Sequence, residues 1–508
     1  MPVVAAIAPG SAEELARFAE LQARLPELIR TVFSDRLSPR TVVVVPGLSV
    51  DAEQLARIPG ALHYEERQLS MLLLLRLPNT RLIYLTSQPI HPLVIDYYLN
   101  MLQGIPTSHA RRRLTLISTY DGALASLTRK VLDRPRLLHR LQESIGDPAR
   151  AHLSVFNSSP LERTLAVALD VPLYACDPAL MHLGGKTGAR RIFRDAGVLC
   201  PDGAEGLRDP RDVAAALAAL KRRNPCLRRA VVKLDEGFSG EGNACFDYQA
   251  VEGAASLERS IERRLPELLD FEAEGEHWEH YCARLREMQG IVEAWIDGGD
   301  KQSPSVQFRI NPLGEIESLS THDQVLGGPS GQVFLGSTFP ARPEYRRLIQ
   351  AEGLKVAEQL RERGVIGRFA VDFVVTLSGD DWTAYAIEIN LRKGGTTHPF
   401  QMLQFLTNGF YDPEDGVFRT QDGQPRFYYA SDNLRKDAYR RLTPDDVIEV
   451  SVEQGLHFDA STQQGVAFSL LGCVSEHGKL GLTAIGNSPA KSQELFDRAV
   501  GALDEAAG

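Results

Sequence analysis

Several features that mark other protein classes are missing from this 508-residue sequence. Its six cysteines are scattered and form no C-x-x-C pair, so neither a zinc site nor a disulfide framework is indicated, which fits a reducing cytosol. The longest apolar run, Met71 to Leu75, is far too short to cross a membrane, and no signal peptide is recognisable. A net charge of −10 provides no basic field for nucleic acid. The sequence predicts a cytoplasmic protein without membrane or nucleic-acid partners.

Two familiar nucleotide-binding fingerprints are also absent. No G-x-G-x-x-G follows an expected strand, so a dinucleotide fingerprint is excluded. The run Gly185-Lys186-Thr187 invites a P-loop interpretation, but Leu180 stands six residues before the lysine, where a P-loop has glycine. No internal repeats occur, and ordinary domain sizes predict about three domains for a chain of this length.

The most informative stretch is A-I-E-I-N-L-R-K-G-G-T-T-H-P at residues 386–399, which reads as a strand entering a glycine turn. Apolar and polar residues alternate here in the order Ile387, Glu388, Ile389, Asn390, Leu391 and Arg392. Alternate residues of a strand share a face, so the apolar three are expected to face a core and the polar three the opposite side. A carboxylate and an amide form a hard-oxygen site suited to Mg²⁺, and an arginine beside them can hold phosphate or oxyanion charge.

The preceding residues predict the partner strand of a hairpin. Val371–Val375 is expected as a strand and Ser378–Asp381 as the turn. Centring the hairpin on Asp380 places Asp372 opposite Glu388, and cross-strand neighbours lie roughly 5 Å apart. Two facing carboxylates repel each other unless something such as a divalent metal neutralises them. The alternative is a solvated polar face with chance pairing, and a one-residue error in register would move Asp372 to the other face.

The first third of the chain alternates short strands with helices, as open parallel α/β sheets do. Strands are expected at Thr41–Val45, Leu82–Leu85, Arg113–Ile117 and His152–Phe156. Further on, Lys233 lies on the expected strand Ala230–Leu234, and the glycine-rich turn Gly237–Asn243 follows. A lysine beside such a loop is a phosphate clamp, although a plain hairpin with a surface lysine explains the pattern as well.

Three further segments complete the expected architecture. Residues 250–289 read as a solvated helical insertion without chemistry, and Ser320–Pro340 as a long glycine-rich loop of the kind that is usually functional or mobile. Beyond Leu406 the composition becomes mixed, with a strand expected at Thr443–Glu449 among others and a closing helix at Pro489–Leu503. This tail predicts a small α+β domain.

An ordered set of motifs resembles the ATP-grasp superfamily over roughly residues 180–410. The set comprises Lys186, Lys233 with its glycine loop, I-V-E-A-W-I at residues 291–296, Asp372, and Glu388-x-Asn390-x-Arg392. Longer runs are similar to the pheganomycin-type peptide ligases, namely L-G-G-K-T-G-A-R-R-I-F-R-D-A-G-V, E-G-F-S-G-E-G-N, E-I-N-L-R-K-G-G-T-T-H-P-F and G-V-A-F-S-L-L-G-C-V-S-E-H-G-K-L-G-L-T-A-I-G.

The resemblance implies a division of the chain into an α/β and α+β architecture. A pre-ATP-grasp α/β domain would occupy residues 1–178 and a small C-terminal α+β domain residues 409–508. The ATP-grasp fold would lie between them at residues 179–408, with a glycine-rich lid around 230–250 and the helical insertion at about 250–289.

The resemblance also implies a role for each matching residue. ATP would be bound by Lys186, Lys233, Ser239, Gly240, Gly242, Glu293, Ala294, Ile296 and Asp300. Two Mg²⁺ ions would be bound by Asp372, Glu388 and Asn390, and Arg392 would stabilise the transferred phosphoryl group or the tetrahedral intermediate. Many relatives carry an arginine two residues before the first metal aspartate; Ala370 stands there and Arg368 four before, so the role of Arg368 is in doubt.

The activity implied by the resemblance is ATP-dependent carboxylate–amine ligation through an acyl phosphate, with ADP and phosphate released. The partners would be a small-molecule carboxylate donor and an amine or peptide acceptor, typically an amino-acid carboxylate joined to the N-terminus of a peptide, and a homo-oligomeric state is left open. The alternatives are a dipeptide or small-metabolite ligase and a nucleotide-binding regulator without turnover. Intact Asp372, Glu388, Asn390 and Arg392 argue against the regulator, and nothing marks a biotinyl carrier domain.

Overall fold

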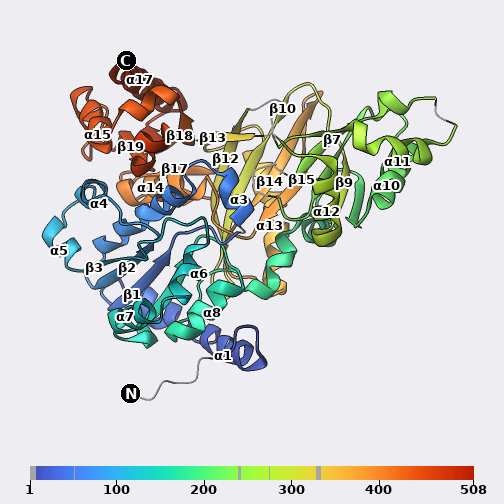
Figure 1. Cartoon of the computed structure of the whole chain (residues 1–508). Helices are drawn as coiled ribbons and strands as arrows, with labels where there is room; N and C mark the ends of the chain where they lie inside the picture. The colour runs from blue at the N-terminus through green and yellow to red at the C-terminus, as the bar shows by residue number, and fades with distance from the viewer. Residues whose placement is uncertain (1–6, 51, 238–241, 254, 274, 328–332) are drawn as a thin grey trace.

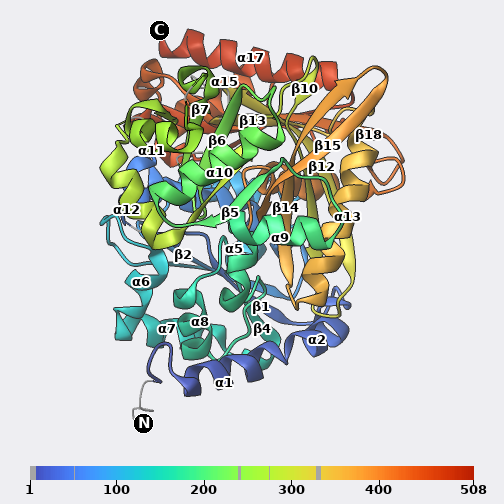
Figure 2. The ribbon, with the colours of Figure 1, turned by 90° about the vertical axis from the view of Figure 1, so that its right-hand side faces the viewer.

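The computed structural model describes residues 7–508 with the exception of 51, 238–241, 254, 274 and 328–332. In Figure 1 a blue α/β unit lies below the red C-terminal elements, and a long yellow and orange sheet stands beside both. A smaller green unit extends from the far side of that sheet, and the helix α1 (Ala12–Gln22) lies at the opposite end of the molecule from the C-terminus in both views (Figures 1 and 2). Within these described ranges, no helix is both long and apolar enough to cross a membrane.

The first unit is the predicted parallel sheet, with strand order β3-β2-β1-β4. Its strands are β1 (Arg40–Val45), β2 (Thr80–Thr86), β3 (Leu114–Ser118) and β4 (Ala151–Val155). Its helices are α1 (Ala12–Gln22), α2 (Leu25–Leu28), α3 (Ala52–Arg57), α4 (Pro92–Asn100), α5 (Thr107–Arg111), α6 (Leu127–Leu132), α7 (Pro135–Ile145) and α8 (Pro160–Leu169), with a 3₁₀ segment at Ala61–Arg76. All six residues of β1 are buried, as expected for a β-branched strand covered on both faces.

Within the described residues, the long sheet contains eleven strands whose pairings are antiparallel. They are β10 (Lys301–Gln302), β11 (Pro304–Ile310), β12 (Ile316–Gly327), β13 (Val333–Phe339), β14 (Gly367–Ser378), β15 (Asp381–Asn390), β16 (Phe410–Asp412), β17 (Val417–Arg419), β18 (Pro425–Arg435), β19 (Gly465–Ser469) and β20 (Lys479–Gly486). The helices α9 (Lys186–Asp195), α13 (Arg346–Glu362) and α14 (Thr397–Thr407) pack against it.

The prediction of a long loop at Ser320–Pro340 is wrong over most of its length. β12 and β13 pair with each other, and β12 also pairs with β11. Only the connection at 328–332 lies outside the described residues. Pairing on both sides satisfies the backbone of β12 and buries Ser320 to His322, which outweighs the loop-like local composition.

The smaller unit is a five-stranded sheet in the order β5-β9-β6-β7-β8. Its strands are β5 (Gly203–Leu207), β6 (Arg229–Leu234), β7 (Asn243–Asp247), β8 (Leu269–Phe271) and β9 (Gly290–Ala294), and its helices are α10 (Pro210–Arg223), α11 (Leu257–Leu268) and α12 (Trp278–Met288). The helices α11 and α12 occupy the residues predicted as a helical insertion, and their standing as an insertion stays a prediction. The same segment also contributes β8, an edge strand paired with β7, which was not predicted.

The strand predicted at Thr443–Glu449 is wrong, because these residues begin the helix α15 (Pro444–Glu453). The Thr443 hydroxyl accepts a hydrogen bond from the Asp446 N–H at 3.3 Å, and the Asp446 carboxylate accepts one from the Thr443 N–H at 2.7 Å. This reciprocal capping, followed by proline in the first turn, is a helix-start signal that is visible in the sequence. The helices α16 (Val474–His477) and α17 (Pro489–Ala507) complete the C-terminal part.

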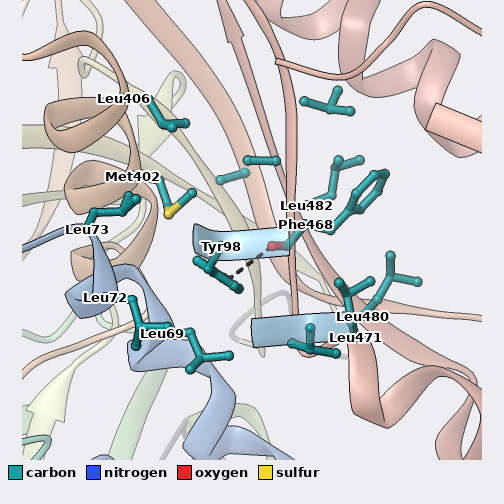
Figure 3. Packing of buried hydrophobic residues seen from close by; sticks show 14 of the residues in the cluster. Leu69, Leu72, Leu73, Tyr98, Met402, Leu406, Phe468, Leu471, Leu480 and Leu482 are labelled. Atoms are coloured by element: carbon teal, nitrogen blue, oxygen red, sulfur yellow. Dashed lines mark hydrogen bonds between the residues drawn. The ribbon is translucent and has the colours of Figure 1, made fainter. Parts of the chain in front are cut away.

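One apolar cluster joins the N-terminal sheet to the C-terminal elements (Figure 3). It combines Leu69, Leu72, Leu73 and Tyr98 with Met402 and Leu406 of α14 and with Phe468, Leu471, Leu480 and Leu482. The Tyr98 hydroxyl donates to the carbonyl oxygen of Phe468 at 3.1 Å. Tyr98 and Phe468 are separated by 370 positions in the sequence. The burial of one part of the chain therefore depends on a part that is distant in sequence. The domain boundaries after 178 and 408 stay a prediction.

Because Leu482 is only 1% exposed within this cluster, Leu482→Ala is expected to lower the free energy of unfolding by about 2–5 kcal/mol. Urea unfolding followed by circular dichroism measures the loss. Leu354→Ala, at a leucine that is 40% exposed, is the matched control and should change stability by less than about 0.5 kcal/mol. A separate early transition for the C-terminal elements would contradict a shared core.

Candidate active site

A cleft of about 460 Å³ lies between the five-stranded sheet and the β14–β15 hairpin. The predicted site residues that line it are Lys186, Lys233, Glu293, Ala294, Ile296, Asp372, Glu388, Asn390 and Arg392. Ser239 and Gly240 lie outside the described residues. Gly242 and Asp300 are not among the described lining residues, although their neighbours Asn243 and Lys301 are. The structure thus brings together most of the residues singled out from the sequence.

The β14–β15 hairpin reaches the predicted pairing by an unpredicted route. Its turn pairs Ser378 with Asp381, which is one residue out of register with the predicted centre. Continued unchanged, that register would place Asp372 opposite Ile387. A β-bulge at Ile387 shifts the register by one residue and places Asp372 opposite Glu388. The predicted pair is confirmed, and the bulge is its cause.

The same bulge makes one prediction about the strand faces wrong. Ile389 and Leu391 are buried in the core, as expected. Ile387, which was expected beside them, is only half-buried and lines the cleft instead. The extra residue of a bulge breaks the two-residue alternation, so the pattern of apolar residues alone could not show this.

The two facing acids have different partners. Lys186 Nζ, at the first residue of α9, donates to Glu388 Oε1 at 2.7 Å. Asp372 Oδ2 accepts from the neutral amide of Asn390 at 3.0 Å. Burial, reinforced by the charge of Glu388, raises the pKa of Asp372 to about 6. Burial alone would also raise the pKa of Glu388, but the charge of Lys186 outweighs it and lowers that pKa. The repulsion between the two carboxylates therefore raises the pKa of Asp372, while the pKa of Glu388 stays lowered.

Glu293 is buried between two cations at the other side of the cleft. Lys233 Nζ donates to Glu293 Oε2 at 2.8 Å, and Arg190 Nη1 donates to Glu293 Oε1 at 2.6 Å. Glu293 thereby holds the Lys233 side chain in the cleft wall. Arg190 was missed in the sequence, although it stands four residues after Lys186 on α9, and this spacing places both on one helix face.

The chain beyond β9 forms the adjacent wall. The Ala294 N–H donates to the carbonyl oxygen of Asp202 at 2.7 Å, so it is already engaged in the fold. The centre of the Trp295 ring lies 4.5 Å from the Arg229 guanidinium carbon and 4.5 Å from Lys301 Nζ. Asp300 lies beside the cleft, where its carboxylate accepts from Gln302 at 2.8 Å.

Side chains from the first and last parts of the chain also enter the cleft. Arg67 Nη1 is 2.9 Å from Asp432 Oδ2, and the Arg67 guanidinium lies 4.0 Å from the centre of the Tyr64 ring. Lys479 Nζ donates to the Tyr64 hydroxyl at 2.7 Å. No local pattern marks these residues in the sequence, because only the packing of distant segments brings them together.

Two histidines that stand near glycine-rich stretches of the sequence are core residues. His322 and His398 are buried and are not among the described lining residues of the cleft. Burial lowers the pKa of His322 to about 3 and that of His398 to about 4. His322 Nε2 lies 2.6 Å from the Tyr428 hydroxyl. Both are therefore neutral and structural near pH 7.

Comparison with known proteins agrees with this geometry. Residues 178–274 and 271–414 match a family described as IQCH-like, ATP-grasp, and residues 446–499 match the PGM1 C-terminal domain. The L-propargylglycine–L-glutamate ligase of Streptantibioticus cattleyicolor is 30% identical over 471 residues, spanning 91% of this chain and 94% of that protein. The chain belongs to the ATP-grasp superfamily of carboxylate–amine ligases.

Other similarities are more distant from this ATP-grasp ligase. The IQ motif-containing protein H of Danio rerio is 23% identical over 485 residues, covering 85% of this chain but 45% of that protein. A biotin carboxylase from Campylobacter jejuni, solved with a β,γ-ATP complex, superimposes with a TM-score of 0.55 at 11% identity, covering 93% of this chain and 95% of that one. At this identity the structural likeness shows the fold alone.

The unequal pairing of the two acids predicts that Asp372→Asn stabilises the protein in metal-free buffer. The raised pKa means that ionised Asp372 destabilises the folded state at neutral pH, by on the order of 2 kcal/mol. The gain should be complete well above pH 6 and should fade as the pH falls from 6 toward 4, since the carboxyl becomes protonated in both states only below the unfolded-state pKa of 3.8. Urea titrations at pH 8 and pH 5 measure it.

Glu388→Gln is the matched comparison, because it removes the partner of Lys186 and should lower stability at pH 8. If Asp372→Asn stabilises the protein equally at both pH values, or if Glu388→Gln stabilises it, the two acids do not differ in their charge compensation as described.

Proposed function

We propose that this ligase uses ATP to join an amino-acid carboxylate to an amine, forming a peptide bond through an acyl phosphate. The observation that supports it most is one cleft containing two facing acids, two lysines from different elements and Arg392. This is the residue set needed to hold nucleotide phosphates and to stabilise a transferring phosphoryl group. A cytoplasmic location and the oligomeric state stay predictions.

The donor set fits magnesium. Asp372, Glu388 and Asn390 present oxygen ligands on one strand pair, and the raised pKa of Asp372 marks an excess of negative charge that a divalent cation relieves. Bound Mg²⁺ would supply charge neutralisation to the nucleotide phosphates. Asn390 keeps Asp372 oriented through their 3.0 Å hydrogen bond.

The lysines are proposed to bind the phosphates of ATP. Lys186 and Lys233 enter the cleft from α9 and β6, and each is held by an acid, Glu388 and Glu293 respectively. The backbone of Ile296 and the carbonyl oxygen of Ala294, whose N–H is engaged with Asp202, would contact the adenine. The assignments of Ser239, Gly240, Gly242 and Asp300 to ATP binding rest on the family resemblance alone.

The chemistry needs no covalent enzyme intermediate. A substrate carboxylate oxygen bonds to the γ-phosphorus of ATP while the bond to the bridging oxygen breaks, and ADP leaves. The amine nitrogen then bonds to the acyl carbon, loses a proton, and expels phosphate as the acyl C–O bond breaks. Arg392 lies on the same cleft wall as the acids and is proposed to stabilise the charge that develops in both steps.

The acceptor is proposed to be the amine of a second amino acid or of a peptide. The name of the relative from Streptantibioticus cattleyicolor describes the ligation of two amino acids, which favours the shorter acceptor. Screening single amino acids against di- and tripeptides as acceptors decides between the two classes.

The proposal predicts ADP and phosphate as stoichiometric products. Purified enzyme with ATP, Mg²⁺, an amino-acid panel and an acceptor panel should release one ADP per amide formed, measured by a coupled assay with mass spectrometry of the product. AMP and pyrophosphate as stoichiometric products would refute the acyl-phosphate route.

Arg392→Lys is expected to retain ATP affinity but to reduce turnover by about 10²–10³-fold, because lysine lacks the planar fork that holds two oxygens. The alternative is a structural arginine, since Arg392 Nη1 also donates to the carbonyl oxygen of Lys393 at 3.1 Å. Turnover per folded molecule and the melting temperature distinguish the two. Arg363→Lys, at a pair with Asp195 that is not part of the cleft, controls for generic effects.

A further inference from the structure

A second cavity of about 310 Å³ lies between the N-terminal parallel sheet and the central antiparallel sheet. Its walls come from β1, β4, the 3₁₀ segment Ala61–Arg76, β11, β14, α14 and the residues after β15. Arg392 and Phe156 line both this cavity and the cleft. The second cavity therefore adjoins the acid-lined end of the cleft, and Arg392 stands between them.

The lining of this second cavity is strongly cationic. Its charged lining residues are Arg40, Arg309, Arg368, Arg392 and Lys393, and no aspartate or glutamate occurs among the described lining residues. Arg309 and Arg368 are direct cross-strand neighbours, and Arg309 pairs with Glu317 outside the lining. Like charges in this arrangement repel each other, so the cavity favours an anionic occupant.

Two of these cations, Lys393 and Arg368, have lowered pKa values. Lys393 Nζ donates to Gln68 Oε1 at 2.7 Å and to Ser154 Oγ at 3.0 Å, both neutral acceptors. Burial and the charge of Arg368 lower the pKa of Lys393 to about 7. Burial and the charge of Arg309 lower the pKa of Arg368 to about 10. A bound anion would compensate both charges.

Buried polar atoms without a partner gather at the same place. Among the residues that the structure describes, Arg368, His152, Ser158 and Thr80 line the cavity, and each has a buried side-chain atom without a hydrogen-bond partner, namely Arg368 Nη1, His152 Nδ1, Ser158 Oγ and Thr80 Oγ1. His152 and Ser158 are more than nine-tenths buried, with exposures of 8% and 5%. Unsatisfied buried polar groups are unfavourable, and a ligand with several oxygen acceptors would satisfy the donors among them.

The remaining wall is apolar, formed by Phe33, Met71, Leu74, Tyr174 and Phe405. A pocket with one charged side and one apolar side suits a small molecule with a carbon chain between polar ends. The cavity volume of about 310 Å³ is in the range for a small metabolite and too small for a folded partner.

We propose that the second cavity binds the acid substrate of the ligase and selects a dicarboxylate of the size of an acidic amino acid. One carboxylate would lie at Arg392, at the boundary with the cleft, where it is activated. The other would bind Arg368 and Lys393. This assignment rests on the proposed function, because it assumes that an acid is activated in the adjoining cleft.

The test is calorimetric binding to the full chain at pH 7, with and without a non-hydrolysable ATP analogue. The probes are L-glutamate and L-aspartate, with L-glutamine and L-asparagine as isosteric neutral controls. At least one acid is expected to bind about 10- to 100-fold more tightly than its amide, as loss of a charged hydrogen-bonding partner predicts. Arg368→Gln and Lys393→Gln should each remove most of this preference.

Matched variants separate charge from folding. Arg368→Lys and Lys393→Arg keep the positive charge and should restore part of the preference for the acid. Arg419→Gln, at a pair with Asp415 that lines neither cavity, should bind as the parent does. Melting temperatures of all variants identify any that fail to fold, and the charge-retaining pair then provides the comparison.

The outcomes distinguish this inference from the proposed function. If neither acid binds better than its amide, or if Arg368→Gln and Lys393→Gln retain the preference, the inference is overturned even when ADP release supports a ligase. If an acid binds as expected and no combination of acid and amine releases ADP, the proposed function fails while the binding site stands.

Discussion

The antiparallel pairing of β14 with β15, shifted by one residue at Ile387, is the constraint on which the cleft depends. Without the shift, Asp372 would face an isoleucine and the polar face would lose its paired acids. The bulge also turns Ile387 out of the core and into the cleft wall. A bulge changes the direction of side chains without breaking the strand, so a rigid sheet can present acids at one side while Ile389 and Leu391 keep the other side in the core.

The charged side chains along the cleft are compensated to different degrees. Glu293 on β9 lies between Lys233 and Arg190, Glu388 on β15 binds Lys186, and Asp372 on β14 accepts from the neutral amide of Asn390. Farther along the same face, Arg368 and Lys393 lie in a cavity without acids among its described lining residues. An acid with a raised pKa and neighbouring cations with lowered pKa values show where the fold retains uncompensated charge. Such positions are where ligands of opposite charge gain most from binding.

The N-terminal sheet is part of this arrangement and not an appendage. Its apolar residues Val42 and Val44 share one core with the C-terminal strands, and His152 and Ser154, their neighbours on the same face of β4, form a wall of the second cavity. Packing the parallel sheet against the central sheet thus closes a pocket that neither forms alone. Arg67 and Lys479, from opposite ends of the chain, reach the first cleft through the same packing.

The sequence by itself determined the alternation of strands and helices in the parallel sheet and the hairpin with its acids and Arg392. It also determined the family. These features could be predicted because strand faces and glycine turns depend on spacing over a few residues. The sequence also contained the capping signal of α15 and the helical spacing of Lys186 and Arg190, which were not recognised. Only the tertiary structure decided the bulge at Ile387, the partner of Glu388 and the second cavity. Lys186 and Glu388 are 202 positions apart. The physical reason is that register and ion pairing over such separations follow from hydrogen-bond pairing and packing between whole elements, which local patterns do not encode.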